Sequence, residues 1–180
     1  LEKITEEARK LLKEADVITL AQELHYCKKY MELFEYRYPS QFQSSVECPL
    51  EYMNVPIIKF VLQPIIENYF IHGIRLREKN NFIKITVEKQ GEDFAILVED
   101  NGQGMTEEEI QEKNRQLKEN KMDKKQSIGI ANVNRRMKAV YGNSYGVYME
   151  RAASGGLKVV LKFRAEGGDE NDENSNACGG

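Results

Sequence analysis

Residues 94–105 read Phe94-Ala95-Ile96-Leu97-Val98-Glu99-Asp100-Asn101-Gly102-Gln103-Gly104-Met105. The continuous apolar run at the start of this stretch predicts a buried strand. The loop that follows holds an acid and two glycines, and glycine lets backbone approach a ligand closely because it has no Cβ atom. We therefore expect a binding pocket where the strand ends.

A second stretch, earlier in the chain, places two polar side chains within an apolar pattern. It reads Leu62-Gln63-Pro64-Ile65-Ile66-Glu67-Asn68-Tyr69-Phe70-Ile71-His72-Gly73. The pattern predicts a helix that buries Glu67 and Asn68, at a cost of several kcal/mol unless each side chain finds a partner. We expect the two stretches to face each other across a nucleotide pocket.

Three motifs follow one another in a fixed order. They are Leu62-Gln63-Pro64-x-x-Glu67-Asn68-x-x-x-His72-Gly73, Asp100-x-Gly102-x-Gly104-Met105 and Gly129-Ile130-x-Asn132-Val133-x-x-Arg136. Together they resemble the ATP-binding domain of two-component sensor histidine kinases, in the LytS/YesM-like branch of the GHKL ATPase superfamily. The resemblance covers roughly residues 15–165.

The resemblance implies an α/β (α+β) two-layer sandwich, the histidine-kinase ATPase fold. We expect a mixed, mostly antiparallel sheet with three helices on one face, and a helical extension at the N-terminus. We divide the chain into the helical extension at 1–40, the ATP-binding catalytic domain at 41–165 and a disordered acidic tail at 166–180.

Local patterns predict the individual elements. Apolar residues at steps of three and four predict amphipathic helices over 1–15 and 20–38, the second begun by the capping box Thr19-x-x-Gln22 and ended by Pro39. These helices either dimerise or pack on their own domain. Further along we expect a strand at 42–48, a long helix opened by Val55-Pro56 and kinked at Pro64, a hairpin at 82–100, a helix from Gly129 and a hairpin at 146–163.

A polar segment runs from the capping box Thr106-x-x-Glu109 to Gln126. Few apolar residues anchor it, so local opening should be easy. The resemblance identifies it as the ATP lid, and the alternative is a solvated helix and loop.

Composition narrows the possible partners. A net charge of −3 over 180 residues gives no electrostatic reason to expect nucleic acid or an anionic membrane. Cys27, Cys48 and Cys178 have no metal-ligand spacing and are interpreted as free thiols in a reducing cytosol. No apolar run is long enough to cross a membrane. We interpret the chain as a cytoplasmic piece of a longer protein that is anchored in the cell membrane.

Asp100 is the candidate for base recognition. A carboxylate there can accept a hydrogen bond from the exocyclic amine of adenine, whereas guanine presents a carbonyl, so the site favours ATP over GTP. The alternative is a simple Asn-Gly turn after a strand. By the resemblance, Gly102, Gly104 and Met105 also contact ATP.

Asn68 offers a side-chain carbonyl oxygen, a hard ligand suited to Mg²⁺ that also binds phosphates. The resemblance gives it that role. Glu67 is the candidate catalytic base or positioning acid, the alternative being a carboxylate paired locally on its helix. His72 lies four residues after Asn68 and can reach the nucleotide, or is a hydrogen-bonded residue at a helix end.

Gly129 and Ile130 open a helix whose free N–H groups suit phosphate. Arg135 and Arg136 either neutralise phosphate or face water. No Gly-Lys-Ser/Thr sequence occurs, which excludes a P-loop. The chain departs from the family pattern at three positions: Ile71 replaces a common Lys, Ser127 a glycine, and Leu157 a common Thr.

The resemblance implies a kinase that transfers the γ-phosphoryl group of ATP to a histidine of its parent protein, for relay to an aspartate of a response regulator. The parent is expected to dimerise through its helical region. The phosphoacceptor motif is absent here, and His25 lies in the wrong motif. Two alternatives stay open: a non-catalytic nucleotide- or partner-binding module, and an ATPase that drives a clamp.

Overall fold

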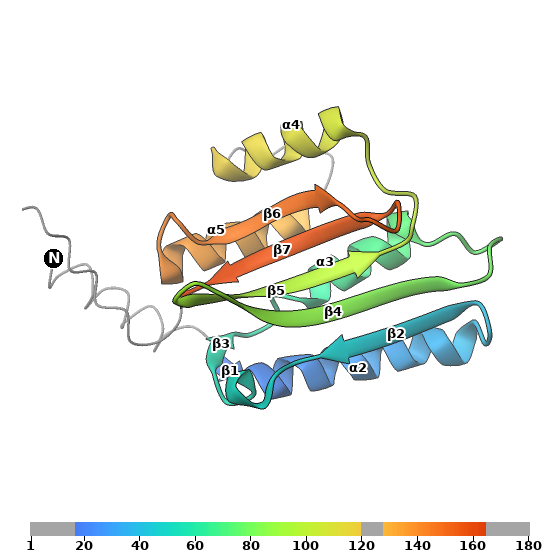
Figure 1. The fold of residues 1–180 in the computed structure, drawn as a ribbon, viewed down its shortest axis with the longest axis horizontal. Helices are drawn as coiled ribbons and strands as arrows, with labels where there is room; N and C mark the ends of the chain where they lie inside the picture. The colour runs from blue at the N-terminus through green and yellow to red at the C-terminus, as the bar shows by residue number, and fades with distance from the viewer. Residues whose placement is uncertain (1–16, 120–127, 165–180) are drawn as a thin grey trace, which may run out of the picture.

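The computed structural model describes residues 17–119 and 128–164 (Figure 1). The elements in chain order are β1 (Val17–Thr19), α2 (Leu20–Arg37), β2 (Phe42–Glu47), a 3-10 turn η1 (Leu50–Tyr52), β3 (Pro56–Ile58), α3 (Gln63–Asn68), a π-helical turn η2 (Tyr69–Gly73), β4 (Asn81–Gln90), β5 (Asp93–Asp100), α4 (Glu107–Lys118), α5 (Ile128–Tyr141), β6 (Gly146–Arg151) and β7 (Leu157–Phe163). The helix predicted over 1–15 and the tail at 166–180 lie outside the described residues.

Five strands form the main sheet, in the order β2-β4-β5-β7-β6. Strand β2 runs parallel to β4, and the remaining neighbours are antiparallel, which confirms the mixed, mostly antiparallel sheet. Helices α2, α3 and α5 lie along one face of the sheet in Figure 1, whereas α4 lies beside the edge strand β6. The predicted two-layer α/β sandwich is confirmed.

Alternation along the strands separates the two faces of the sheet. Ile83, Ile85 and Val87 of β4 point toward the helices and are buried, while their neighbours along the strand are more exposed. Asp100 is opposite Ile83 in the β4–β5 register and is buried as well. The acid therefore lies on the helix side of the sheet, at the end of its central strand.

Helix α2 begins where the sequence predicted. The Thr19 side chain accepts a hydrogen bond from the Gln22 backbone N–H, and the Gln22 side-chain oxygen accepts one from the Thr19 backbone N–H, so the capping box is confirmed. The apolar face of the helix joins the common core through Leu20, Leu24, Cys27 and Met31. This packing agrees with the alternative in which the helix packs on its own domain. The division of the chain at residue 40 stays a prediction.

The long helix expected from Val55-Pro56 is wrong at its start. Residues Pro56–Ile58 form strand β3, which pairs antiparallel with β1, and Val17 is opposite Ile58. Phe60 then has a φ of 58°, a left-handed conformation that a helix cannot contain. The helix begins only at Gln63.

This later start also removes the kink predicted at Pro64. Pro64 stands in the first turn of α3, where its missing N–H has no helical partner to lose. Glu67 and Asn68 are half-buried rather than enclosed, because α3 turns this side away from the core residues Ile65 and Ile66. The desolvation cost expected for the polar pair is correspondingly smaller.

Helix α4 is fixed to the sheet more firmly than its composition suggested. The predicted capping box forms between Thr106 and Glu109. Asn114 donates to the Met149 carbonyl and accepts from the Met149 N–H, both at 2.8 Å, and so covers the backbone of edge strand β6. The end of the predicted lid, residues 120–126, lies outside the described chain. Within residues 17–119 and 128–164, no helix has the length and hydropathy of a membrane span.

Candidate nucleotide site

The structure brings the end of the α3 segment against the loop that follows β5. The Gln103 N–H donates to the Gly73 carbonyl at 2.9 Å. A Cβ atom at Gly102 would lie 2.3 Å from that same carbonyl oxygen, so only glycine fits there. The two stretches that the sequence predicted to face each other are therefore in contact.

Asp100 is held by backbone on one side. Its Oδ1 atom accepts from the Gly102 N–H at 2.7 Å and from the Leu157 N–H at 3.3 Å. A Cβ atom at Gly156 would lie 2.4 Å from Oδ1, so a second glycine closes this side of the carboxylate. The other oxygen, Oδ2, accepts no hydrogen bond from any residue in the described part of the chain. It is the oxygen available to a ligand.

Burial changes the acidity of this group. Asp100 is 7% exposed, and desolvation raises the pKa of its carboxyl above the ordinary value, although the Gly102 and Leu157 N–H groups oppose the change. A partly desolvated carboxylate gains more from a new hydrogen-bond donor than a hydrated one does. The site therefore favours a ligand that presents an N–H group to Oδ2.

Two asparagines fix the surroundings of this loop. Asn101 accepts from the Phe82 N–H and donates to the Asn80 carbonyl, both at 2.8 Å, which ties the loop to the start of β4. The motif thus contains a structural residue, Asn101, directly after Asp100.

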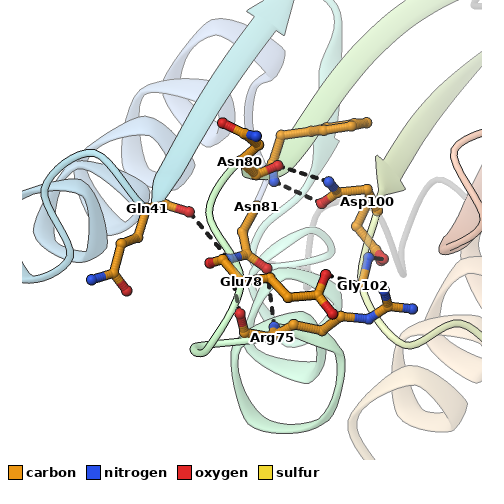
Figure 2. Close-up of polar contacts among 9 residues, drawn as sticks. Gln41, Arg75, Glu78, Asn80, Asn81, Asp100 and Gly102 are labelled. Atoms are coloured by element: carbon orange, nitrogen blue, oxygen red, sulfur yellow. Dashed lines mark hydrogen bonds and ion pairs between the residues drawn. The ribbon is translucent and has the colours of Figure 1, made fainter.

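Asn81 holds the connection between η2 and β4 (Figure 2). The side chain is 3% exposed and donates to the carbonyls of Gln41, Arg75 and Glu78 while it accepts from the Arg75 N–H at 3.0 Å. The sequence indicated only a turn at this position. No local pattern could have identified the role, because one partner is 40 residues away.

Three predicted site residues lie on the exposed side of α3 and η2. The Asn68 side chain is half-buried and makes no hydrogen bond with any described residue, so its oxygen is available to a ligand. Glu67 accepts from Gln63 Nε2 at 2.8 Å, a local pairing of the kind that the alternative interpretation foresaw, with an amide in place of a cation. His72 is exposed.

Helix α5 begins beside α3. A Cβ atom at Gly129 would lie 3.1 Å from Pro64 Cβ, and Ile130 is buried next to it in the chain. Arg136 donates to the Lys59 carbonyl at 2.7 Å, and Arg135 donates to Asn132 Oδ1 at 2.6 Å. Both guanidinium groups therefore have protein partners.

Glu23 is a further polar residue that sequence reasoning missed. It is 1% exposed, and its two oxygens accept from the Phe60 N–H at 2.9 Å and the Leu62 N–H at 3.0 Å. These N–H groups lie just before α3, so a residue of α2 holds the segment that leads into the helix that carries Asn68. The available signal was an acid beside Leu24, on the apolar side of the predicted helix.

The remaining predicted contacts are the loop residues after Gly102. Gly104 has a φ of 66°, and a Cβ atom there would lie 2.6 Å from the Gly155 carbonyl, so the loop packs on the β6–β7 turn. Met105 is half-buried against the core. Their contact with a nucleotide stays a prediction.

This geometry has counterparts among known proteins. Residues 55–167 match the family described as histidine kinase-, DNA gyrase B- and HSP90-like ATPases. The chain belongs to this ATPase family. The match covers all three motifs and most of the main sheet, and it confirms the resemblance to the ATP-binding domain of sensor histidine kinases.

Individual curated relatives are also sensor histidine kinases. The sensor histidine kinase/phosphatase LytS of Staphylococcus aureus (strain MRSA252) is 31% identical over 141 residues, which are 77% of this chain and 24% of that protein. The same protein of strain Mu50 is 30% identical over the same length. The chain thus spans about a quarter of the length of the curated relatives that it matches.

Solved structures share the fold. The catalytic domain of histidine kinase ThkA superposes with a TM-score of 0.61 at 14% identity, over 83% of this chain and 96% of that one. The ATP-binding domain of PrrB from Mycobacterium tuberculosis gives a TM-score of 0.55 at 17% identity, over 84% and 97%. At such identities the likeness concerns the fold alone.

Proposed function

We propose that this ATPase domain binds ATP with Mg²⁺ between α3 and the loop after β5, and that it is the catalytic part of a sensor histidine kinase. The observation that carries the proposal is Asp100, a buried carboxylate with one oxygen held by two backbone N–H groups and the other left for a ligand. Family membership supplies the chemical context.

The residues present fit adenine. Its exocyclic amine is a donor for Asp100 Oδ2, whereas guanine offers an acceptor at the same position. Glycines at 102 and 156 leave space that any Cβ atom would fill, so the backbone and the carboxylate pack without a side chain between them. ATP is therefore favoured over GTP.

The residues also fit a magnesium ion shared with phosphate. No group of three His, Cys, Asp or Glu side chains suited to a metal occurs among the described residues. A Mg²⁺ ion here would depend on the Asn68 oxygen together with phosphate oxygens and water, the kind of ligand set that Mg²⁺ commonly has beside nucleotides. The N-terminal turn of α5 would supply backbone N–H groups to the phosphates.

The bound nucleotide supplies the γ-phosphoryl group, and the protein's contribution is positioning and charge neutralisation. Asn68 would hold the metal, and the metal would help to orient the phosphates. Glu67, one residue before it, acts as base or positioning acid toward the acceptor once it exchanges its hydrogen bond with Gln63. His72 lies at the exposed rim of the site and contacts the nucleotide.

The acceptor histidine belongs to a part of the parent protein outside this chain. The chain has two histidines, and neither His25 nor His72 lies in a phosphoacceptor motif. The phosphoryl group then passes to a response regulator, and the parent acts as a homodimer anchored in the membrane. These statements rest on relatives of which the chain covers only 24%.

A non-catalytic module is the second candidate, and the three departures from the family pattern, at Ile71, Ser127 and Leu157, favour it. Ile71 removes a cation from the phosphate end, and Leu157 removes a hydroxyl from the base end. Titration calorimetry with ATP, in Mg²⁺ and in EDTA, separates the two candidates. Micromolar binding strengthened by Mg²⁺ supports the kinase, whereas no binding at millimolar ATP contradicts it.

A test of phosphoryl transfer needs the histidine that accepts the phosphoryl group. The chain is mixed with the acceptor-bearing helical region of its parent and radiolabelled ATP, and labelling of that region is the expected result. Steady release of phosphate without any acceptor would instead favour an ATPase that drives a clamp.

A further inference from the structure

Tyr69 carries a buried hydroxyl group without a partner. The residue directly follows Asn68, is 3% exposed, and its hydroxyl makes no hydrogen bond with any part of the chain that the structure describes. A buried polar group left unpaired costs about 1–3 kcal/mol. Such groups are few in native proteins, and each one calls for an explanation such as a ligand or an ordered water.

The Tyr69 ring is packed beneath the loop that carries Asp100. A Cβ atom at Gly73 would lie 2.8 Å from Tyr69 Cδ2, and the Gly73 carbonyl is in turn pressed against Gly102, whose N–H binds Asp100. The ring of Phe42 lies 6.1 Å from the Tyr69 ring. The aromatic ring is thereby confined beside this loop, with its hydroxyl buried.

The hydroxyl is a hydrogen-bond donor near neutral pH. Burial raises the pKa of Tyr69, and the Asp100 charge raises it further. A tyrosine hydroxyl is protonated at this pH even without such a shift, because its ordinary pKa is about 10. The Tyr69 hydroxyl and Asp100 Oδ2 therefore supply one donor and one acceptor that have no partner among the described residues.

We propose that the Tyr69 hydroxyl is a second base-recognition group, which works together with Asp100. Adenine presents a donor and an acceptor side by side, the exocyclic amine and the ring nitrogen N1. Asp100 accepts from the amine, and Tyr69 donates to N1 directly or through one water molecule. Guanine has the reverse pattern, because its N1 carries a hydrogen. This inference deepens the proposed function and rests on it.

The hydroxyl is tested by Tyr69→Phe, which keeps the ring and its packing. Calorimetry with the full chain compares ATP with 1-deaza-ATP, in which a C–H group replaces N1. We expect wild type to bind 1-deaza-ATP about tenfold more weakly than ATP, the value of one hydrogen bond of about 1.4 kcal/mol. The Tyr69→Phe variant should bind ATP about tenfold more weakly than wild type does, and its affinity for 1-deaza-ATP should equal that of wild type.

The controls separate this role from a structural one. Tyr26→Phe removes a hydroxyl from a side chain that is 49% exposed on α2, and it should leave both affinities unchanged. The melting temperature of Tyr69→Phe should stay level or rise, because an unpaired group is removed. Equal ATP affinity in wild type and Tyr69→Phe overturns this inference while the proposed function stands. Failure of wild type to bind ATP overturns both.

Discussion

The two ends of the proposed nucleotide pocket differ in how many hydrogen bonds their polar side chains make within the protein. At the base end, Asp100 accepts two backbone hydrogen bonds and is enclosed by glycines. At the phosphate end, Asn68 makes no hydrogen bond with a described residue and His72 is exposed. If the proposed pocket binds ATP, the fold preorganises the base end, and the groups of the phosphate end find their partners only in the ligand.

The largest expected effect follows from Asp100→Asn. The amide keeps an oxygen for the Gly102 and Leu157 N–H groups but turns an NH₂ group toward the ligand, where adenine also presents a donor. We expect about a 100-fold loss of ATP affinity, near 3 kcal/mol, and a preference for GTP in competition calorimetry. Glu99→Gln makes the same chemical change one residue earlier and should leave ATP affinity as it is. If Asp100→Asn still prefers ATP to GTP, Asp100 is not the residue that recognises the base.

A pair of glycine variants compares the rigidity of the two ends. At Gly156 an added Cβ would lie 2.3 Å from the Asp100 backbone oxygen, whereas at Gly129 it would lie 3.1 Å from Pro64 Cβ. Gly156→Ala should lower the free energy of unfolding by about 2–3 kcal/mol. Gly129→Ala should change it by less than about 1 kcal/mol, because better helix propensity offsets the contact. Urea unfolding measures both, and equal losses would contradict the difference.

Asn68→Ala tests the phosphate end. Because Asn68 has no protein partner among the described residues, its loss should change the free energy of unfolding by less than about 0.5 kcal/mol. ATP affinity should fall about tenfold in Mg²⁺ and remain level in EDTA, as expected for one metal ligand among several. Equal losses in both buffers would show that Asn68 does not hold the metal.

A pH titration tests the base end of the pocket, and we expect several-fold changes in adenosine affinity. Burial raises the pKa of Asp100 in the folded state. Adenosine affinity should therefore fall as pH drops through this raised value, at a higher pH than for an ordinary aspartate. The contribution of Asp100 to stability has the opposite trend: the folded state holds the proton more firmly, so this contribution falls as pH rises from the unfolded pKa to the folded one. Asp100→Asn should abolish both trends.

The smallest effect is expected from Ile71→Lys. Ile71 is 70% exposed on η2, at the phosphate end, where the branch commonly has a lysine. The added cation should raise ATP affinity about two- to threefold at low salt and less at high salt, because exposed charges are screened. Adenosine affinity should not change. A gain for adenosine as well would place Ile71 at the base end.

Local patterns were enough for the elements that depend on nearby residues. The two capping boxes, the β4–β5 hairpin and the strand before Asp100 were predicted, because each is set by residues within a few positions. The contact between the two motifs was predicted from the resemblance and from the glycines of the loop.

The features that were missed depend on residues far apart in the chain. Strand β3 forms because Val17 and Ile58 pair, and the apolar composition of 55–62 is equally compatible with a helix. Glu23 accepts from the Leu62 N–H, just before α3, across 39 residues, and Asn81 donates to the Gln41 carbonyl across 40. Such contacts leave no periodic pattern in the sequence.

Glu23 gives the molecule a mechanical property. Because its carboxylate is enclosed and accepts two backbone hydrogen bonds ahead of α3, sliding α2 away would strand a buried charge, at a cost of several kcal/mol. Helices α2 and α3 are therefore mechanically coupled. A displacement of α2 would be transmitted through this contact to α3, whose last residue is Asn68, the proposed metal ligand.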